Sequence, residues 1–175
     1  MSTLNELESH LQEIPLLNYR EALVLAAKRY IGYKATSYQG PKNGKDPSNG
    51  FDCSGFVAFL LQQIGFPLPE NYSLRHVNEF FDHLGIYIDF EFREAGDLVF
   101  FSYNRYVGQR PTHMGIMVDP NHYIHSPGQN NSVTLVEELN EEIIPDVPEQ
   151  IYRTNPIGFK RLTLPTRRGR WQRFA

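Results

Sequence analysis

The sequence GFDCSGFV, residues 50–57, contains the only cysteine of this 175-residue chain. A single cysteine can form neither an internal disulfide nor a thiolate metal site on its own, so it is either a reactive thiol or a small buried side chain. Turn- and cap-forming residues surround Cys53, and an apolar run follows at Val57, which predicts that the sulfur lies at or beside a helix N-terminus. There the helix dipole and free N–H groups are expected to lower the pKa of the thiol, which favours the reactive alternative.

The composition fits one globular domain with no general affinity for nucleic acid. A length of 175 residues fits a single domain, and 12 Phe and 10 Tyr suit a packed core and an aromatic-lined cleft. A net charge of −3 gives no electrostatic attraction toward nucleic acid. No apolar run approaches the roughly 18–20 residues of a membrane span, and the N-terminus has no secretory signal pattern. We therefore expect no membrane span, and a protein that is cytoplasmic or exported by a specialised route.

The first part of the chain is predicted to be helical. A helix is expected over residues 18–31, with Asn18 as its N-cap and Gly32 at its end, because these apolar residues share one face: Leu23, Ala26, Ala27 and Tyr30. Residues 36–50 are rich in Gly, Pro, Asn and Ser and predict a loop that leads to Cys53.

Two further helices are expected after this loop. One covers residues 53–64 and ends at Gly65, and the other runs from Tyr72 to about Leu84 and ends at Gly85. The pattern then changes to short apolar segments separated by turns, which predict strands over residues 97–101, 113–118, 123–126, 132–136 and 158–162. Helices followed by an antiparallel sheet define the α+β class.

Two of the six histidines could supply a base for the thiol. If the strands carrying His113 and His125 form a hairpin about the turn at residues 119–121, the two imidazoles lie nearly opposite each other and share a face. Packed against the helix that starts at Cys53, they would form a Cys–His–His line, with His113 as base and His125 as its orienting acceptor. The alternative is that both are hydrogen-bonded polar residues at strand ends, and spacing alone leaves this open.

A zinc site built from histidines is not expected. His122 and His125 are three residues apart on a predicted strand and point to opposite faces, so they cannot join His113 in one ligand set. The chain also lacks a helical His-Glu-x-x-His. We therefore expect no metal.

Five ordered segments make the chain resemble the NlpC/P60 cysteine peptidases of the papain-like superfamily, over most of residues 20–162. They are similar to the family's nucleophile motif, the Pro-Arg segment after it, the Pro-Gly-Asp-Leu strand, the His-Val-Gly-Ile strand and the strand of the third catalytic group: residues 51–57, 74–75, 95–101, 113–118 and 123–127. The resemblance implies a circularly permuted papain-like fold of the α+β class. We expect the catalytic domain at residues 18–163, between an N-terminal arm or helix at 1–17 and a basic tail at 164–175.

The resemblance also implies an activity and a set of site residues. It implies cleavage of peptidoglycan stem peptides or muropeptides, typically between D-γ-glutamyl and a diamino acid, without a cofactor. Cys53 corresponds to the nucleophile, His113 to the base and His125 to the orienting residue. The residues that correspond to substrate contacts are Asp52, Ser54, Arg75 and Tyr38.

One segment departs from the family pattern. The family usually has a tyrosine, an aromatic residue and two glycines before the nucleophile, whereas aligning Gly40 with the last glycine puts Thr36 at the tyrosine position. Either Tyr38 or Tyr33 replaces that tyrosine, or the oxyanion depends on backbone N–H groups at the helix start.

Alternatives to a peptidase remain open from the sequence. The same thioester chemistry serves an acyltransferase or another amidase, and a non-catalytic binding protein could keep the fold. The tail, with four arginines and Trp171, either contacts an anionic polymer or partner, or is solvated and anchored by its tryptophan.

Overall fold

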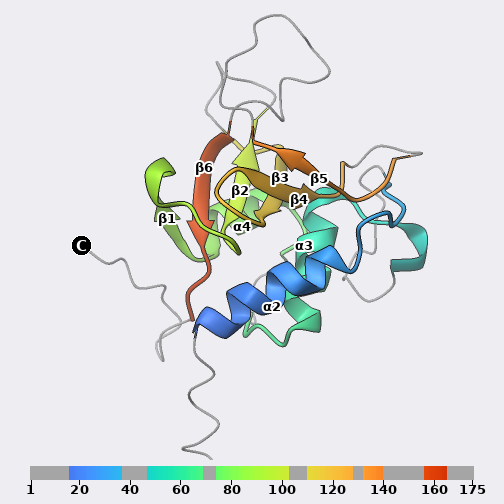
Figure 1. Ribbon diagram of the computed structural model, residues 1–175, viewed down its shortest axis with the longest axis horizontal. Helices are drawn as coiled ribbons and strands as arrows, with labels where there is room; N and C mark the ends of the chain where they lie inside the picture. The colour runs from blue at the N-terminus through green and yellow to red at the C-terminus, as the bar shows by residue number, and fades with distance from the viewer. Residues whose placement is uncertain are drawn as a thin grey trace, which may run out of the picture.

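The computed structural model describes residues 16–36, 47–68, 74–102, 110–127, 132–139 and 156–164 (Figure 1). Within them lie three α-helices, α2 (Leu16–Lys28), α3 (Cys53–Gln63) and α4 (Val77–His83). The strands are β1 (Ile86–Ile88), β2 (Leu98–Phe101), β3 (His113–Met117), β4 (His122–His125), β5 (Leu135–Glu138) and β6 (Pro156–Arg161). They form one antiparallel sheet in the order β1-β6-β2-β3-β4-β5. The predicted α+β class is confirmed.

The core lies on both faces of the central strands. Every residue of β2 and β3 is buried, and successive side chains point to opposite faces. One face packs against α2 and α3, and its strand residues are Leu98, Phe100, Met114, Ile116 and Ile124. The other face carries a smaller apolar cluster: Val99, Phe101, Met117, Tyr123, Leu139 and Phe159. Because both sides of the sheet are covered, the strand ends near β3 are fixed in position.

Helix α3 follows from its cap and its apolar residues. Asp52 has an extended backbone, and its carboxylate accepts the N–H of Gly55 at 2.7 Å, as an N-cap does. Within the helix, the buried residues include Phe56, Val57, Leu60 and Leu61. After it, Gly65 adopts a left-handed φ of 67°. The predicted helix over 53–64 is therefore confirmed to within one residue, and it begins at the cysteine.

The structure corrects the predicted starts of two helices. Helix α2 already begins at Leu16, so Asn18 lies inside its first turn and is not the N-cap. Helix α4 begins at Val77 rather than at Tyr72, which lies outside the described residues. The reason lies at buried Leu74, whose φ of 44° cannot continue a helix. The Glu79 carboxylate instead accepts the N–H of Arg75 at 2.8 Å, which starts the helix later.

The β3–β4 register differs by two residues from the predicted hairpin. Ile116 pairs with Ile124 and Met117 with Tyr123, so the ladder, continued by one residue, sets His125 opposite Gly115 instead of opposite His113. The turn causes the shift, because Asp119 accepts the N–H of both Asn121 and His122, at 2.7 and 2.9 Å, and centres the hairpin one residue later. A shift of two residues keeps both histidines on the same face.

The remaining strand predictions are partly right. The strands expected over 132–136 and 158–162 are shifted to 135–138 and 156–161, and β1 was not predicted. The arm at 1–17, the basic tail and Tyr38 lie almost entirely outside the described residues, so the domain boundaries stay predictions.

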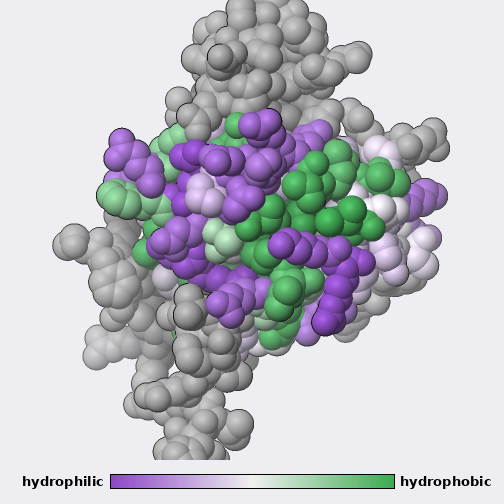
Figure 2. Space-filling model, viewed as in Figure 1, coloured by the Kyte–Doolittle hydropathy of each residue, from purple (hydrophilic) through white to green (hydrophobic). Residues whose placement is uncertain are grey.

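Hydrophobic surface lies over α2 and the β4–β5 side of the molecule (Figure 2). The large exposed side chains there include Leu25 of α2 and Val136 of β5, which are 61% and 40% exposed. None of the described helices is both long and apolar enough to cross a bilayer.

Candidate active site

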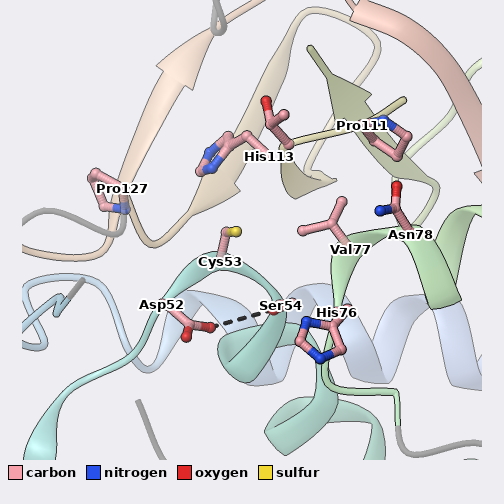
Figure 3. Close-up of a pocket in the computed structure, with 10 residues that line it drawn as sticks. Asp52, Cys53, Ser54, His76, Val77, Asn78, Pro111, His113 and Pro127 are labelled. Atoms are coloured by element: carbon pink, nitrogen blue, oxygen red, sulfur yellow. Dashed lines mark hydrogen bonds between the residues drawn. The ribbon is translucent and has the colours of Figure 1, made fainter. Parts of the chain in front are cut away.

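A pocket of about 330 Å³ opens where the start of α3, the start of α4 and the start of β3 meet (Figure 3). Figure 3 shows the Cys53 side chain and the His113 ring facing this space from opposite walls. The lining residues are Asp52, Cys53, Ser54, His76, Val77, Asn78, Pro111, Thr112, His113 and Pro127. Three of the residues predicted from the motif around Cys53 therefore share one pocket with the predicted base.

The Cys53 thiol does not have the lowered pKa that its helix start predicted. Burial and the negative charge of Asp52 raise the pKa of Cys53 to about 12. The backbone N–H groups of Met114, Ser54 and Cys53 act in the opposite direction but do not outweigh burial. The sequence prediction was wrong because it counted the helix terminus and not the desolvation. A thiol whose pKa is raised in this way needs a base to become a nucleophile.

The two predicted histidines form a close pair. Nε2 of His113 lies 2.7 Å from Nδ1 of His125, within hydrogen-bond distance, and the rings are nearly perpendicular at 89°. The His113 residue is 3% exposed and His125 is fully buried, so bulk water hardly competes for this contact. The structure thus brings His113 and His125 together, as their spacing had suggested. The two residues lie diagonally across the β3–β4 pair and not directly opposite each other.

The glycine opposite His125 makes this contact possible. A Cβ at Gly115 would lie 2.8 Å from the Tyr123 ring and 3.2 Å from the Cβ of His125. Both distances are closer than ordinary packing allows, so any larger residue would displace β4. The His125 ring also packs against the Tyr123 ring, with the two centroids 5.1 Å apart and the ring planes tilted by 43°.

The predicted substrate residues Asp52, Ser54 and Arg75 form a second cluster. Arg75 pairs with both carboxylate oxygens of Asp52, through Nη1 at 3.0 Å from Oδ1 and through a close Nη2–Oδ2 ion pair. The Ser54 hydroxyl donates to the Arg75 carbonyl at 2.7 Å. Asp52 and Ser54 line the pocket, whereas Arg75 is not among the lining residues and contacts Asp52 from behind.

Other pocket residues were not predicted from the sequence. His76 is exposed and lines the pocket, and it lies directly between Arg75 and the first residue of α4. Pro127 ends the motif-like segment 123–127, whereas Asn78 and Thr112 carry no motif, and only their proximity in sequence to Arg75 and His113 could have suggested them.

Tyr38 and Tyr33 were the two candidates to replace the family tyrosine, and the structure tests only Tyr33. Tyr38 lies outside the described residues. Tyr33 is 46% exposed, packs against Tyr30 and is not among the lining residues, so it does not replace the tyrosine in this pocket. Thr36 is buried, and its N–H donates to the Phe51 carbonyl at 2.8 Å.

Among the described residues, no group of three or more His, Cys, Asp or Glu side chains is arranged to hold a metal ion. The side chains that line the pocket offer the Cys53 thiol, the imidazoles of His76 and His113 and the Asp52 carboxylate as chemical groups.

A cysteine at the start of a helix, packed on an antiparallel sheet whose strands carry paired histidines, defines the papain-like cysteine peptidase fold. The model of the NlpC/P60 family matches residues 37–153, and the chain belongs to this family.

Curated and solved relatives agree with this assignment. The chain is 30% identical over 87 residues to a gamma-D-glutamyl-L-lysine dipeptidyl-peptidase of Bacillus cereus, covering 50% of this chain and 24% of the relative. A crystal structure of an NlpC/P60 family protein from Bacillus cereus matches with a TM-score of 0.60 and 24% identity, over 82% of this chain and 40% of that one. The chain thus spans about a quarter of the length of the first of these relatives.

Members of the NlpC/P60 family are cysteine peptidases, but not all of them are active. RipD of Mycobacterium tuberculosis, with a TM-score of 0.53 and 14% identity over 83% of this chain and 98% of that one, is described as a non-catalytic NlpC/p60 domain protein adapted to peptidoglycan binding. Activity therefore has to be argued from the residues of this chain.

Proposed function

We propose that this protein is a cysteine peptidase that cleaves peptidoglycan stem peptides between D-γ-glutamyl and a diamino acid. The observation that carries the proposal is the buried His113–His125 contact of 2.7 Å, with His113 in the same pocket as Cys53. The substrate class is supported by the name of the Bacillus cereus relative, a gamma-D-glutamyl-L-lysine dipeptidyl-peptidase.

Cys53 acts as nucleophile and His113 as base. Because Nε2 of His113 contacts His125, Nδ1 is the ring nitrogen left to act on the thiol. It takes the thiol proton as the sulfur bonds to the carbonyl carbon, and it returns this proton to the leaving amine when the tetrahedral intermediate collapses to a thioester. Water then attacks the thioester with His113 again as base, which releases the acid and restores the thiol.

The thiol pKa decides the order of the first step. A thiol with a pKa of about 12 is not ionised in advance, so proton transfer to His113 accompanies attack on the carbonyl. We assign stabilisation of the developing oxyanion to the N–H groups near the sulfur, including that of Cys53. A donor of this kind contributes about 10²–10³ in kcat, which lessens the dependence on a tyrosine before the nucleophile.

Substrate binding is assigned to the Asp52 side of the pocket. Asp52 and Ser54 line it, while Arg75 fixes the Asp52 carboxylate in place. Tyr38, which lies outside the described residues, is assigned to substrate binding from the family resemblance alone. His125 orients His113 and does not touch the substrate.

The test is cleavage of defined muropeptides followed by mass spectrometry. The wild-type protein should release a γ-D-glutamyl product from a stem tripeptide and leave the α-linked isomer intact, while Cys53→Ala should abolish turnover. Full turnover by Cys53→Ala would overturn the mechanism. Binding of muropeptides without cleavage by the wild-type protein would contradict the proposal and favour the role described for RipD.

A further inference from the structure

We propose that Glu137 is a positioning residue that fixes the proton arrangement of the histidine pair. Oε2 of Glu137 lies 3.0 Å from Nε2 of His125, the ring nitrogen that is not in contact with His113. The chain thus places a carboxylate, two imidazoles and the thiol in succession: Glu137, His125, His113 and Cys53. For its kinetic consequence, this inference rests on the proposed peptidase activity.

The strand pairing delivers Glu137 to this position. β4 and β5 pair Tyr123 with Glu137 and His125 with Leu135, so Glu137 shares a face of the sheet with His125. The hydroxyl of Tyr123, itself fully buried, donates to Oε2 of Glu137 at 2.8 Å. The same oxygen is therefore held by a neighbouring tyrosine and lies at ion-pair distance from the imidazole. The contact with His125 is close without being a straight hydrogen bond, so it acts mainly through charge.

The carboxylate decides which ring nitrogen of each histidine carries a proton. A carboxylate beside Nε2 favours the form of His125 that carries its proton on Nε2. Nδ1 of His125 then has a lone pair and accepts a hydrogen bond from the Nε2–H group of His113. In neutral His113, this leaves the lone pair on Nδ1, the nitrogen needed to accept the thiol proton. With the opposite tautomer of His125, Nδ1 of His113 would carry the proton and could not act as base.

A matched control stands next to Glu137 in the same strand. Glu138 is exposed and points to the opposite face of the sheet. Its register partner in β4 is His122. Glu137→Ala and Glu138→Ala remove the same carboxylate from adjacent positions, and only the first removes it from the histidine pair. The side chain of Glu137 is 27% exposed, so its loss is not expected to prevent folding.

The decisive measurement is NMR of the histidine ring nitrogens in the ¹⁵N-labelled protein, which needs no turnover. In the wild type and in Glu138→Ala, His125 should be protonated at Nε2 only. In Glu137→Ala, its signals should move toward a mixture of both tautomers. A proton on Nδ1 of wild-type His125, or identical His125 signals in all three proteins, would overturn the proposal.

Kinetics on muropeptides provide the second readout. Glu137→Ala should lower kcat by about tenfold with KM unchanged, since hydrogen bonds and contacts to a charged group contribute on the order of 1.5 kcal/mol. Glu138→Ala should keep the wild-type kcat. An equal loss in both variants would overturn the positioning role. If the wild-type protein cleaves no muropeptide, the NMR result still stands, so failure of the peptidase assignment is distinguishable from failure of this one.

Discussion

Cys53 lies between two polar clusters that use their charges differently. On the helix side, Asp52 is paired with Arg75 and caps α3, so its carboxylate is satisfied within the protein. On the sheet side, His113 and His125 form a line that starts at Glu137 and ends at the pocket. The first cluster holds Cys53 in place, and Asp52 in it adds to the burial that raises the pKa of the thiol. The second cluster holds the groups that we propose remove the thiol proton. In this proposal, the helix-side residues set the position and the resting pKa of the thiol, and the sheet-side residues supply its proton acceptor.

The sharpest test of this division is the loss of the base. His113→Ala removes the ring that faces the pocket opposite Cys53 and should lower kcat by about 10⁴-fold, because a thiol with a raised pKa then has no proton acceptor. The melting temperature of the His113→Ala variant should stay close to that of the wild-type protein. Steady-state kinetics on a muropeptide together with a melting curve check both expectations. Retention of most of the activity would mean that another group takes the thiol proton.

The helix-side cluster should show the reverse pattern, with the larger effect on stability. Arg75→Ala leaves the Asp52 carboxylate, whose side chain is only 4% exposed, without its cation and should lower the free energy of unfolding by about 3 kcal/mol. Arg110→Ala is the matched control, because its ion pair with Asp82 is exposed and contributes at most about 1 kcal/mol. Urea unfolding of both variants measures the difference. Equal losses would mean that burial does not distinguish the two ion pairs.

The raised thiol pKa predicts how Cys53 reacts with iodoacetamide. Far below a pKa of about 12, the thiolate fraction increases about tenfold per pH unit, so the alkylation rate should climb steadily from pH 7 to 10. Asp52→Asn keeps a capping side chain but removes the charge that raises the pKa, so its alkylation curve should move to lower pH. A wild-type rate that is flat between pH 6 and 9 would instead indicate a preformed thiolate–imidazolium pair.

Sequence patterns predicted the parts of this molecule that depend on local physics. Helix α3 was found because a cap, an apolar run and a terminating glycine all lie within about fifteen residues. The pairing of His113 with His125 was found because a hairpin of known turn position keeps residues of equal parity on one face. The register itself was wrong by two residues, since the Asp119 side chain moves the centre of the turn.

The parts that were missed depend on contacts between distant segments. The thiol pKa was predicted with the wrong sign because desolvation comes from the packing of α3 on β3 and not from the residues around Cys53. Glu137 carries no motif, and its approach to His125 depends on the β4–β5 register. His76 reaches the pocket only because the left-handed backbone at Leu74 delays the start of α4.

The smallest expected effect concerns the hydroxyl that holds Glu137. Tyr123→Phe keeps the ring that packs beside His125 and removes only the donor 2.8 Å from Oε2 of Glu137. Without this donor the carboxylate can rotate toward solvent, so kcat should fall about two- to fivefold, consistent with the loss of one hydrogen bond of about 0.5–1 kcal/mol. In Glu137→Ala the same tyrosine substitution should have no further effect on kcat, because its partner is already absent. A double variant whose loss equals the product of the two single losses would show that Tyr123 acts on the histidines independently of Glu137. The sheet-side cluster would then consist of separate contacts and not of one connected line.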